Sequence, residues 1–289
     1  MKILIQVYAK DILNLGIKPN ILIELVKNRY LASGGVLYED TPLKKIDIYS
    51  DTAVLDLGDK HINSRLVIDS MGNASPISKQ IRGPIEPDGI CIVVGTCARG
   101  YDPKNNTYSD IIYTDTPITS MASSKQQYFW EAFPAGSGPS DRTTYLFTYM
   151  DAKPERPSVS EILDDYWSLL PRYQGVDIEN LNFTRVLYGV FPTYRSSPIK
   201  SNLDRIIQVG DASGIQSPLS FGGFGSLTRH IERITGAINE ALAPEEDPYK
   251  EFYPARKYIQ NDLVSSAYLS MINSYQPNLR VCWMFQVSQ

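Results

Sequence analysis

Residues 205–242, RIIQVGDASGIQSPLSFGGFGSLTRHIERITGAINEAL, combine an apolar strand, a glycine-rich loop and a long helix. The strand is expected over Arg205–Val209, and the helix repeats apolar residues at steps of three or four. These residues form one helical face and are Leu227, Ile231, Ile234, Ile238 and Leu242. Strand, loop and helix in this order are typical of α/β folds, in which helices cover a parallel sheet.

The loop between this strand and this helix is suited to binding a pyrophosphate. Backbone N–H groups at a helix N-terminus favour an anion, and glycines at 222, 223 and 225 allow the backbone to approach it closely. Asp211, at the carboxyl end of the strand, is placed to accept hydrogen bonds from ribityl or ribose hydroxyls. The residues alone leave open a second interpretation, a tight turn whose glycines serve packing.

A second apolar run, RLVIDSMG at 65–72, ends in a polar turn and is typical of a strand buried on both faces of a parallel sheet. Before it, the sequence predicts an amphipathic helix over Pro19–Leu31, with Ile21, Leu25 and Val26 on one side. Three short strands are expected between these two segments, the last two as a hairpin: Val36–Glu39, Lys45–Tyr49 and Ala53–Leu57.

The middle of the chain alternates in hydrophobicity and predicts an antiparallel sheet with one strongly aromatic face. The expected strands are Ile90–Thr96, Asp110–Tyr113, Gln127–Phe133, Thr143–Tyr149 and Phe183–Phe191, with a helix over Ser158–Leu170 before the last. In TYLFTY, alternation sets Tyr145, Phe147 and Tyr149 against Thr144, Leu146 and Thr148. In YFWEAF it sets Tyr128, Trp130 and Ala132 against Phe129, Glu131 and Phe133.

The composition excludes several classes of function. With 28 Lys+Arg, 32 Asp+Glu, a net charge of −4 and no basic block, the chain is not expected to bind nucleic acid. Three widely spaced Cys and two isolated His, His61 and His230, predict neither a disulfide framework nor a metal site. No apolar run is long enough for a membrane span, and no targeting peptide is readable.

The segment GDASGIQSP, followed by GGFG, resembles the C-terminal flavin motif of a class of FAD-dependent oxidoreductases. This class includes geranylgeranyl reductases, lycopene cyclases and aromatic-ring hydroxylases, and RLVIDSMG resembles its second signature. More narrowly, IDSMGNASPISKQIRGPIEPDGICIVVGTCARG and FWEAFPAGSGPSDRTTYLFTY are similar to lycopene-cyclase-like FAD/NAD(P)-binding proteins of plants, algae and cyanobacteria. The narrower resemblance covers nearly the whole chain.

The resemblance implies FAD as cofactor, NAD(P)H as reductant, and an apolar substrate of isoprenoid or carotenoid type. It implies that Gly210, Asp211 and Ala212 meet the ribityl–phosphate region, while Asp69 and Gly72 support the cofactor side of their strand. The residues implied to shape the loop against the pyrophosphate and isoalloxazine are Pro218, Gly222, Gly223 and Gly225. It also implies a location in plastids or the cyanobacterial cytoplasm.

Two departures from the family pattern affect these expectations. The opening G-x-G-x-x-G motif is missing from this sequence, so at least two parallel strands and one helix are expected to be absent. The chain is then a fragment, a degenerate relative, or part of a complex whose protein partner covers the exposed strand edge at 65–72. Lycopene cyclases carry paired acidic residues where this chain has Phe147 and Thr148, so cyclase activity by that acid is not expected.

The sequence therefore predicts an α/β protein with an incomplete FAD/NAD(P)-binding, Rossmann-like parallel sheet and an inserted antiparallel substrate sheet. The predicted domains are 1–80 with 200–245 for FAD, 85–195 for an apolar small-molecule substrate, and a helical segment at 246–289. The predicted function is that of an FAD-binding oxidoreductase, with peripheral membrane contact compatible with its substrate. The alternative is a non-catalytic structural or assembly subunit.

Five further residues have both a functional and a simpler interpretation. Glu131, between aromatic residues, is either a general acid with a raised pKa or an outward-facing edge glutamate. Asp141 and Arg142 follow a loop, and they are either surface-turn residues or residues that orient a substrate. Arg195 is a candidate for a phosphate or carboxylate contact, and His230 is expected to be a surface or capping residue.

Overall fold

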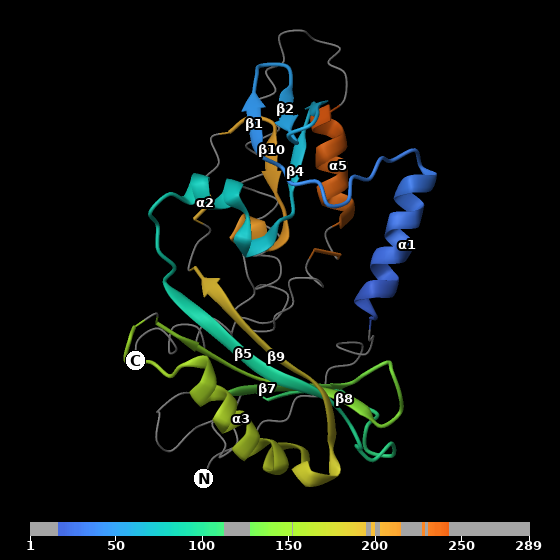
Figure 1. Ribbon diagram of the computed structural model, residues 1–289, viewed down its shortest axis with the longest axis vertical. Coiled ribbons are helices and arrows are strands. Elements are labelled where there is room, and N and C mark those ends of the chain that lie inside the picture. Colours follow the sequence, from blue (N-terminus) through green and yellow to red (C-terminus); the bar gives the residue numbers. More distant parts are fainter. Residues whose placement is uncertain are drawn as a thin grey trace. The chain divides into compact units, whose positions relative to one another are not determined.

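The computed structural model describes residues 17–112, 128–151, 153–194, 198–199, 203–214, 227–228 and 231–242. The chain divides into two compact units (Figure 1), and each is described by itself. Unit 1 comprises Met1–Leu37 and Gly89–Phe191, and unit 2 comprises Tyr38–Asp88 and Pro192–Gln289. The domain limits inferred from the sequence remain predictions.

Unit 2 holds a three-stranded antiparallel sheet and a pair of parallel strands. The antiparallel strands are β1 (Lys45–Ile48), β2 (Ala53–Asp56) and β3 (His61–Ser64). The parallel pair is β4 (Val67–Asp69) with β10 (Ile206–Gln208), in a register that places Ile207 beside Ile68. The helical elements are η1 (Gly72–Ala74), α2 (Pro76–Arg82), η3 (Gly210–Ser213) and α5 (Ile231–Leu242).

Each face of the parallel pair packs against a different part of unit 2. Val67 and Ile206 join Ala53 in a cluster with residues of the antiparallel sheet and α2. Ile207 packs against Ala237 and Ile238 of α5, so one residue of the predicted apolar stripe, Ile238, covers the parallel strands, whereas Ile231 of the same stripe is 46% exposed. Ile68 remains 49% exposed, and the prediction that β4 is buried on both faces is therefore wrong for this residue.

Arg205 ties the β1–β2 turn to the start of β4. Its backbone has φ +59°, a left-handed conformation that is unfavourable for a residue with a Cβ. Its guanidinium donates hydrogen bonds to the carbonyl oxygens of Tyr49 (3.2 Å), Ser50 and Arg65 (3.1 Å). These three bonds hold the residue in a conformation that the local sequence alone does not favour.

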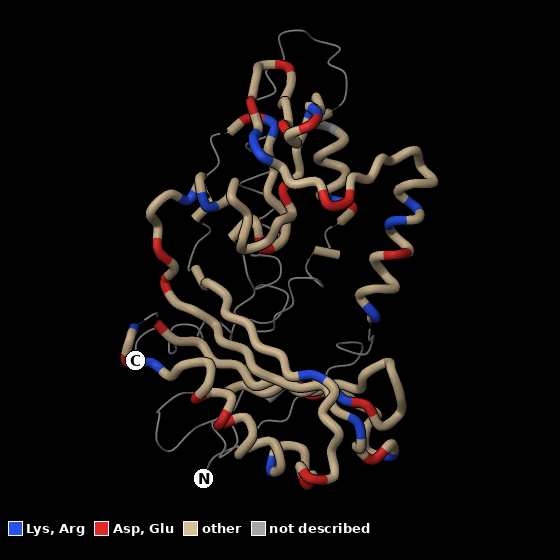
Figure 2. Tube along the Cα trace, in the orientation of Figure 1, with Lys and Arg blue, Asp and Glu red and all other residues tan. Residues whose placement is uncertain are grey.

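Unit 1 is built on a five-stranded sheet of order β6-β7-β8-β5-β9. The strands are β5 (Gly89–Arg99), β6 (Asp110–Ile112), β7 (Phe129–Pro134), β8 (Asp141–Met150) and β9 (Asn182–Thr193). β5, β8, β7 and β6 pair antiparallel in turn, as the alternating pattern predicts. Few charged residues lie along the middle of these strands (Figure 2), which is typical of a sheet with two covered faces.

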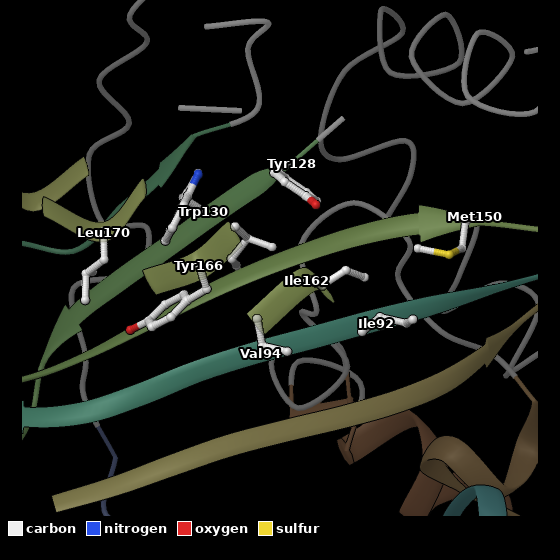
Figure 3. Close-up of a cluster of buried hydrophobic side chains, with 9 residues drawn as sticks. Ile92, Val94, Tyr128, Trp130, Met150, Ile162, Tyr166 and Leu170 are labelled. Atoms are coloured by element: carbon white, nitrogen blue, oxygen red, sulfur yellow. The ribbon is translucent and has the colours of Figure 1, made fainter. Parts of the chain in front are cut away.

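Helix α3 (Val159–Gln174) covers one face of this sheet, which we call the helix face. Ser158 caps the helix in a capping box with Glu161, and Gly175 ends it with φ +63°. Ile162, Tyr166 and Leu170 of α3 pack against a buried cluster (Figure 3). The other residues of that cluster are Ile92, Val94, Tyr128, Trp130, Leu146 and Met150, all from the sheet strands except Tyr128, which precedes β7.

The opposite face of the sheet, which we call the aromatic face, carries the alternate residues of β5, β7 and β8. Phe129 stacks on Phe147 with ring centroids 5.3 Å apart, and Tyr149 meets Phe147 edge-on at 6.2 Å. This confirms the predicted division of TYLFTY and YFWEAF between two faces. Aromatic residues are not confined to one of them, because Tyr128, Trp130 and Tyr166 belong to the helix face.

The expected strand at Val36–Glu39 is wrong. These residues follow α1 (Pro19–Ala32) without forming a ladder, because no described strand lies beside them to accept their hydrogen bonds. Helix α1 itself is confirmed, but none of its residues is buried, and Ile21, Leu25 and Val26 are all exposed. A further helix, η2 (Ile178–Asn180), precedes β9.

The assignment of Arg142 to a surface turn is also wrong. Arg142 lies in β8, is 3% exposed, and donates hydrogen bonds to Asn106 Oδ1 (3.0 Å) and Asp110 Oδ2 (3.1 Å). Asp110 also accepts a hydrogen bond from Tyr173 of α3. The guanidinium is therefore held within the helix face, where it links β8, β6 and α3 rather than a substrate.

Gly95→Ala tests the cross-strand packing of the aromatic face. A Cβ at Gly95 would overlap the carbonyl oxygen of Thr144 and the ring of Tyr145, both in the neighbouring strand β8. We expect a loss of about 1–3 kcal/mol in the free energy of unfolding, measured by urea denaturation. Gly236→Ala in α5 is the matched control, since a Cβ there meets no atom within 4 Å. Equal stabilities of the two variants would contradict this packing.

Candidate functional site

The candidate cofactor site lies where β4 and β10 end. Parallel strands present their carboxyl ends at the same edge of a sheet, which is where α/β folds bind ligands. The Val209 N–H donates to the carbonyl oxygen of Asp69 (2.9 Å), so the pairing continues to the last residue of β4. The loops that follow both strands, each predicted to contact FAD, therefore start side by side.

Asp69 faces into its own loop. Its side chain is 2% exposed, and its oxygens accept hydrogen bonds from the Met71 N–H (3.0 Å) and the Ser75 hydroxyl (2.6 Å). Gly72 takes φ +66° in this loop, a conformation that favours glycine. Both residues order the turn from β4 into α2, which is compatible with the predicted supporting role of Asp69.

The turn after β10 presents its first two residues to the outside. Gly210 has φ +60°, and a Cβ there would meet no atom within 4 Å. Gly210 and Asp211 are exposed, whereas Ala212 is 1% exposed. Partial burial by the surrounding chain raises the pKa of Asp211 above its usual value. Of the three residues predicted to meet the ribityl–phosphate region, two are thus accessible and the third is an internal anchor.

The remaining cofactor residues predicted from the sequence lie outside the described residues. These are Pro218, Gly222, Gly223 and Gly225. Arg195 and His230 also lie outside them. Their predicted roles stay predictions.

Glu131 lies on the aromatic face of unit 1, in a different unit from the turn at Gly210. It stands opposite Tyr145 of β8 and Ile111 of β6 in the sheet register. Burial, followed by the negative charge of Asp110, raises the pKa of Glu131 from 4.5 to about 7. Of the two interpretations of Glu131, this burial favours the one in which its carboxyl has a raised pKa.

The sequence reasoning missed Ser75 and Ser78. Ser75 accepts a hydrogen bond from the Ser78 N–H (3.0 Å) as N-cap of α2, and the Ser78 hydroxyl reaches the carbonyl oxygen of Ala212 (2.6 Å). A Ser followed directly by Pro is a readable start signal for a helix. The contact with Ala212 has no such local signal, because it joins distant parts of the chain.

Two kinds of feature are absent from the described residues. No group of three or more His, Cys, Asp or Glu among them could hold a metal ion. None of the helices within them is long and apolar enough to cross a membrane.

Comparisons with known proteins place the fold. No family model matches the chain, and no curated protein matches it. Among solved structures, a triple mutant of the flavin-dependent brominase Bmp2 has a TM-score of 0.55 at 16% identity. A variant of the halogenase PltM in complex with FAD has a TM-score of 0.53 at 14% identity, and FqzB has 0.53 at 12%.

These similarities cover most of this chain and little more than half of the others. The matches span 83%, 86% and 86% of this chain, against 60%, 52% and 57% of the Bmp2, PltM and FqzB chains. At sequence identities this low, these similarities show a shared fold and nothing more. The chain therefore has an α/β fold of the FAD-dependent oxidoreductase type.

Glu131→Gln tests the titration of Glu131 through stability. A folded-state pKa raised to about 7 means that Glu131 favours folding when neutral, below pH 4.5, and loses this contribution as pH rises to 7. Relative to the variant, the wild type should lose about 2–3 kcal/mol of unfolding free energy between pH 4.5 and pH 8. Urea denaturation across this range measures the difference, with exposed Glu86→Gln as control. Parallel pH profiles for wild type and Glu131→Gln would refute the raised pKa.

Proposed function

We propose that the chain belongs to an FAD-binding oxidoreductase-like protein that acts on an apolar substrate. The observation that carries this proposal is the exposed Gly210–Asp211 turn, at the carboxyl end of a parallel strand pair in a fold shared with flavin-dependent enzymes. One neighbour with this fold is described in complex with FAD.

The residues of the turn fit the ribityl part of FAD. Gly210 has open space where a side chain would project, so a ligand can approach its backbone. The exposed Asp211 carboxylate offers hydrogen-bond acceptors for sugar-alcohol hydroxyls. For the ADP half of FAD we assign no residues, because residues 1–289 contain no G-x-G-x-x-G motif.

FAD would supply the electron or hydride chemistry, and the protein residues would supply position and a proton. The proposed substrate surface is the part of the aromatic face around the partly exposed Glu131, Tyr145 and Tyr149, since flat apolar molecules pack well against aromatic rings. Glu131 lies on this face with a pKa of about 7, so its carboxyl can donate or accept a proton at neutral pH. We propose it as the general acid.

The finer parts of the proposal rest on sequence resemblance alone. They are an isoprenoid or carotenoid-type substrate, NAD(P)H as the reductant, peripheral membrane contact and a plastid location. The lycopene-cyclase acid is not part of the proposal, because Phe147 and Thr148 occupy the matching positions.

A second candidate function is a non-catalytic assembly subunit. The observation that favours it is the exposure of apolar residues in each unit: Ile23, Leu25 and Val26 on α1 of unit 1, and separately Ile68 and Met71 around β4 of unit 2. Neighbouring exposed apolar side chains are typical of surfaces that bind another protein. Stable association with a partner in a flavin-free state would favour this function.

Retention of FAD tests the first proposal. The 289-residue chain, and the longest chain that its gene encodes, are mixed with FAD, desalted, and measured by visible flavin absorbance. We expect a retained flavin band that Asp211→Ala abolishes, because the ribityl contact is lost. Asp59→Ala, an exposed carboxylate elsewhere in unit 2, is the matched control and should retain the band. No band in either wild-type chain would reject FAD binding, and full retention by Asp211→Ala would remove Asp211 from the site.

A further inference from the structure

The exposed Gly210–Asp211 dipeptide is anchored at both ends. On one side, the Val209 N–H donates to the carbonyl oxygen of Asp69 (2.9 Å), the last residue of β4. On the other side, the carbonyl oxygen of Ala212 accepts a hydrogen bond from the Ser78 hydroxyl (2.6 Å). The first anchor belongs to the strand ladder, whereas the second comes from a single side chain on α2.

A chain of buried hydrogen bonds fixes the Ser78 side chain. Asp69 accepts from the Ser75 hydroxyl (2.6 Å), and the oxygen of Ser75 accepts from the Ser78 N–H (3.0 Å). The Ser78 oxygen lies 2.6 Å from Ala212 O and 3.3 Å from Asp69 Oδ2. A serine hydroxyl has one proton, and the shorter distance assigns it to Ala212.

Burial makes this second anchor important for the turn. Ser78 is 8% exposed and Ala212 is 1% exposed, so the Ala212 carbonyl has little access to solvent if the hydroxyl is removed. The turn also contains Gly210 at φ +60°, and glycine by itself permits many other backbone conformations. Within the turn, the Ser213 hydroxyl donates to the Gly210 carbonyl oxygen (2.6 Å) and the Gly214 N–H donates to the Asp211 carbonyl oxygen (3.1 Å). Ser78 adds the side-chain link that fixes the turn to α2.

We propose that Ser78 is a positioning residue that holds the Gly210–Asp211 turn in the conformation that binds its ligand. The ligand part of this inference rests on the proposed FAD site. Ser78 acts through Ala212, and it transmits the position of the Asp69 loop to the loop after β10. The segments RLVIDSMG and GDASGIQSP are thus connected not only by the pairing of β4 with β10 but also by the hydrogen bond from Ser78 to Ala212.

Hydrogen exchange in Ser78→Ala tests the anchor without any ligand. We expect the amides of residues 211–214 to exchange about three- to tenfold faster, in line with the loss of one buried hydrogen bond. Amides in β5 and β8 of unit 1 should not change. Ser78→Thr keeps the hydroxyl and should restore slow exchange. Ser64→Ala, which removes the hydrogen bond from Ser64 to the Leu66 carbonyl in the same unit, is the matched control.

The outcomes separate this inference from the proposed function. Unchanged exchange at 211–214 in a folded Ser78→Ala variant, or uniform acceleration across the whole chain, would overturn the anchor. FAD affinity is then measured for the same variants, and we expect a several-fold loss in Ser78→Ala and none in Ser64→Ala. If wild type binds FAD and Ser78→Ala binds it equally well, the positioning role is wrong. If wild type does not bind FAD, the proposed function fails, while the exchange result still decides the anchor.

Discussion

The parallel pairing of β4 with β10 is the constraint on which the candidate site depends. These two strands are short and come from distant parts of the chain, yet their register brings Asp69 and Val209 into hydrogen-bond contact. Both loops that resemble flavin motifs begin at that point. Parallel strands need a crossover connection, and in this chain the residues between β4 and β10 include the five-stranded sheet of unit 1.

The polar groups of unit 2 show how a site can be ordered without being in contact with its ligand. Asp69 is a carboxylate in a motif that resembles a cofactor signature, but its hydrogen bonds go to Met71 and Ser75. Asp211 is the carboxylate that remains exposed. Asp69 therefore orders the loops through its hydrogen bonds, and Asp211 is accessible to a ligand.

In unit 1, alternation along the strands separates a helix face from an aromatic face, and each has its own polar residue with a specific environment. On the helix face, Arg142 donates hydrogen bonds to Asn106 and Asp110, and Asp110 accepts one from Tyr173 of α3, so the strands are linked to the helix. On the aromatic face, Glu131 has no cation beside it among the causes of its raised pKa, and burial dominates. A buried carboxyl without a compensating charge is less stable when ionised, which is why the pKa of Glu131 is raised.

Local pattern determined much of the fold. The periodicity of β8, the capping signals around α3 and the apolar stripe of α5 predict elements that the structure contains, because these signals act between neighbours in sequence. The same reasoning failed for Val36–Glu39, since a strand also needs a partner, and for Arg142, whose partners lie far along the chain. The exposure of α1 and Ile68 was equally beyond local pattern, because burial depends on what packs against an element.

By itself the sequence determined the α/β class, the two glycine-containing loops after apolar strands, and Asp69, Asp211 and Glu131 as candidate site residues. The tertiary structure alone decided which of these carboxylates is buried, which is exposed and which has a raised pKa. It also revealed the contact between Ser78 and Ala212. The physical reason is that solvation and hydrogen bonding depend on groups that come together only on folding, whereas strand and helix preferences depend mainly on neighbouring residues in the sequence.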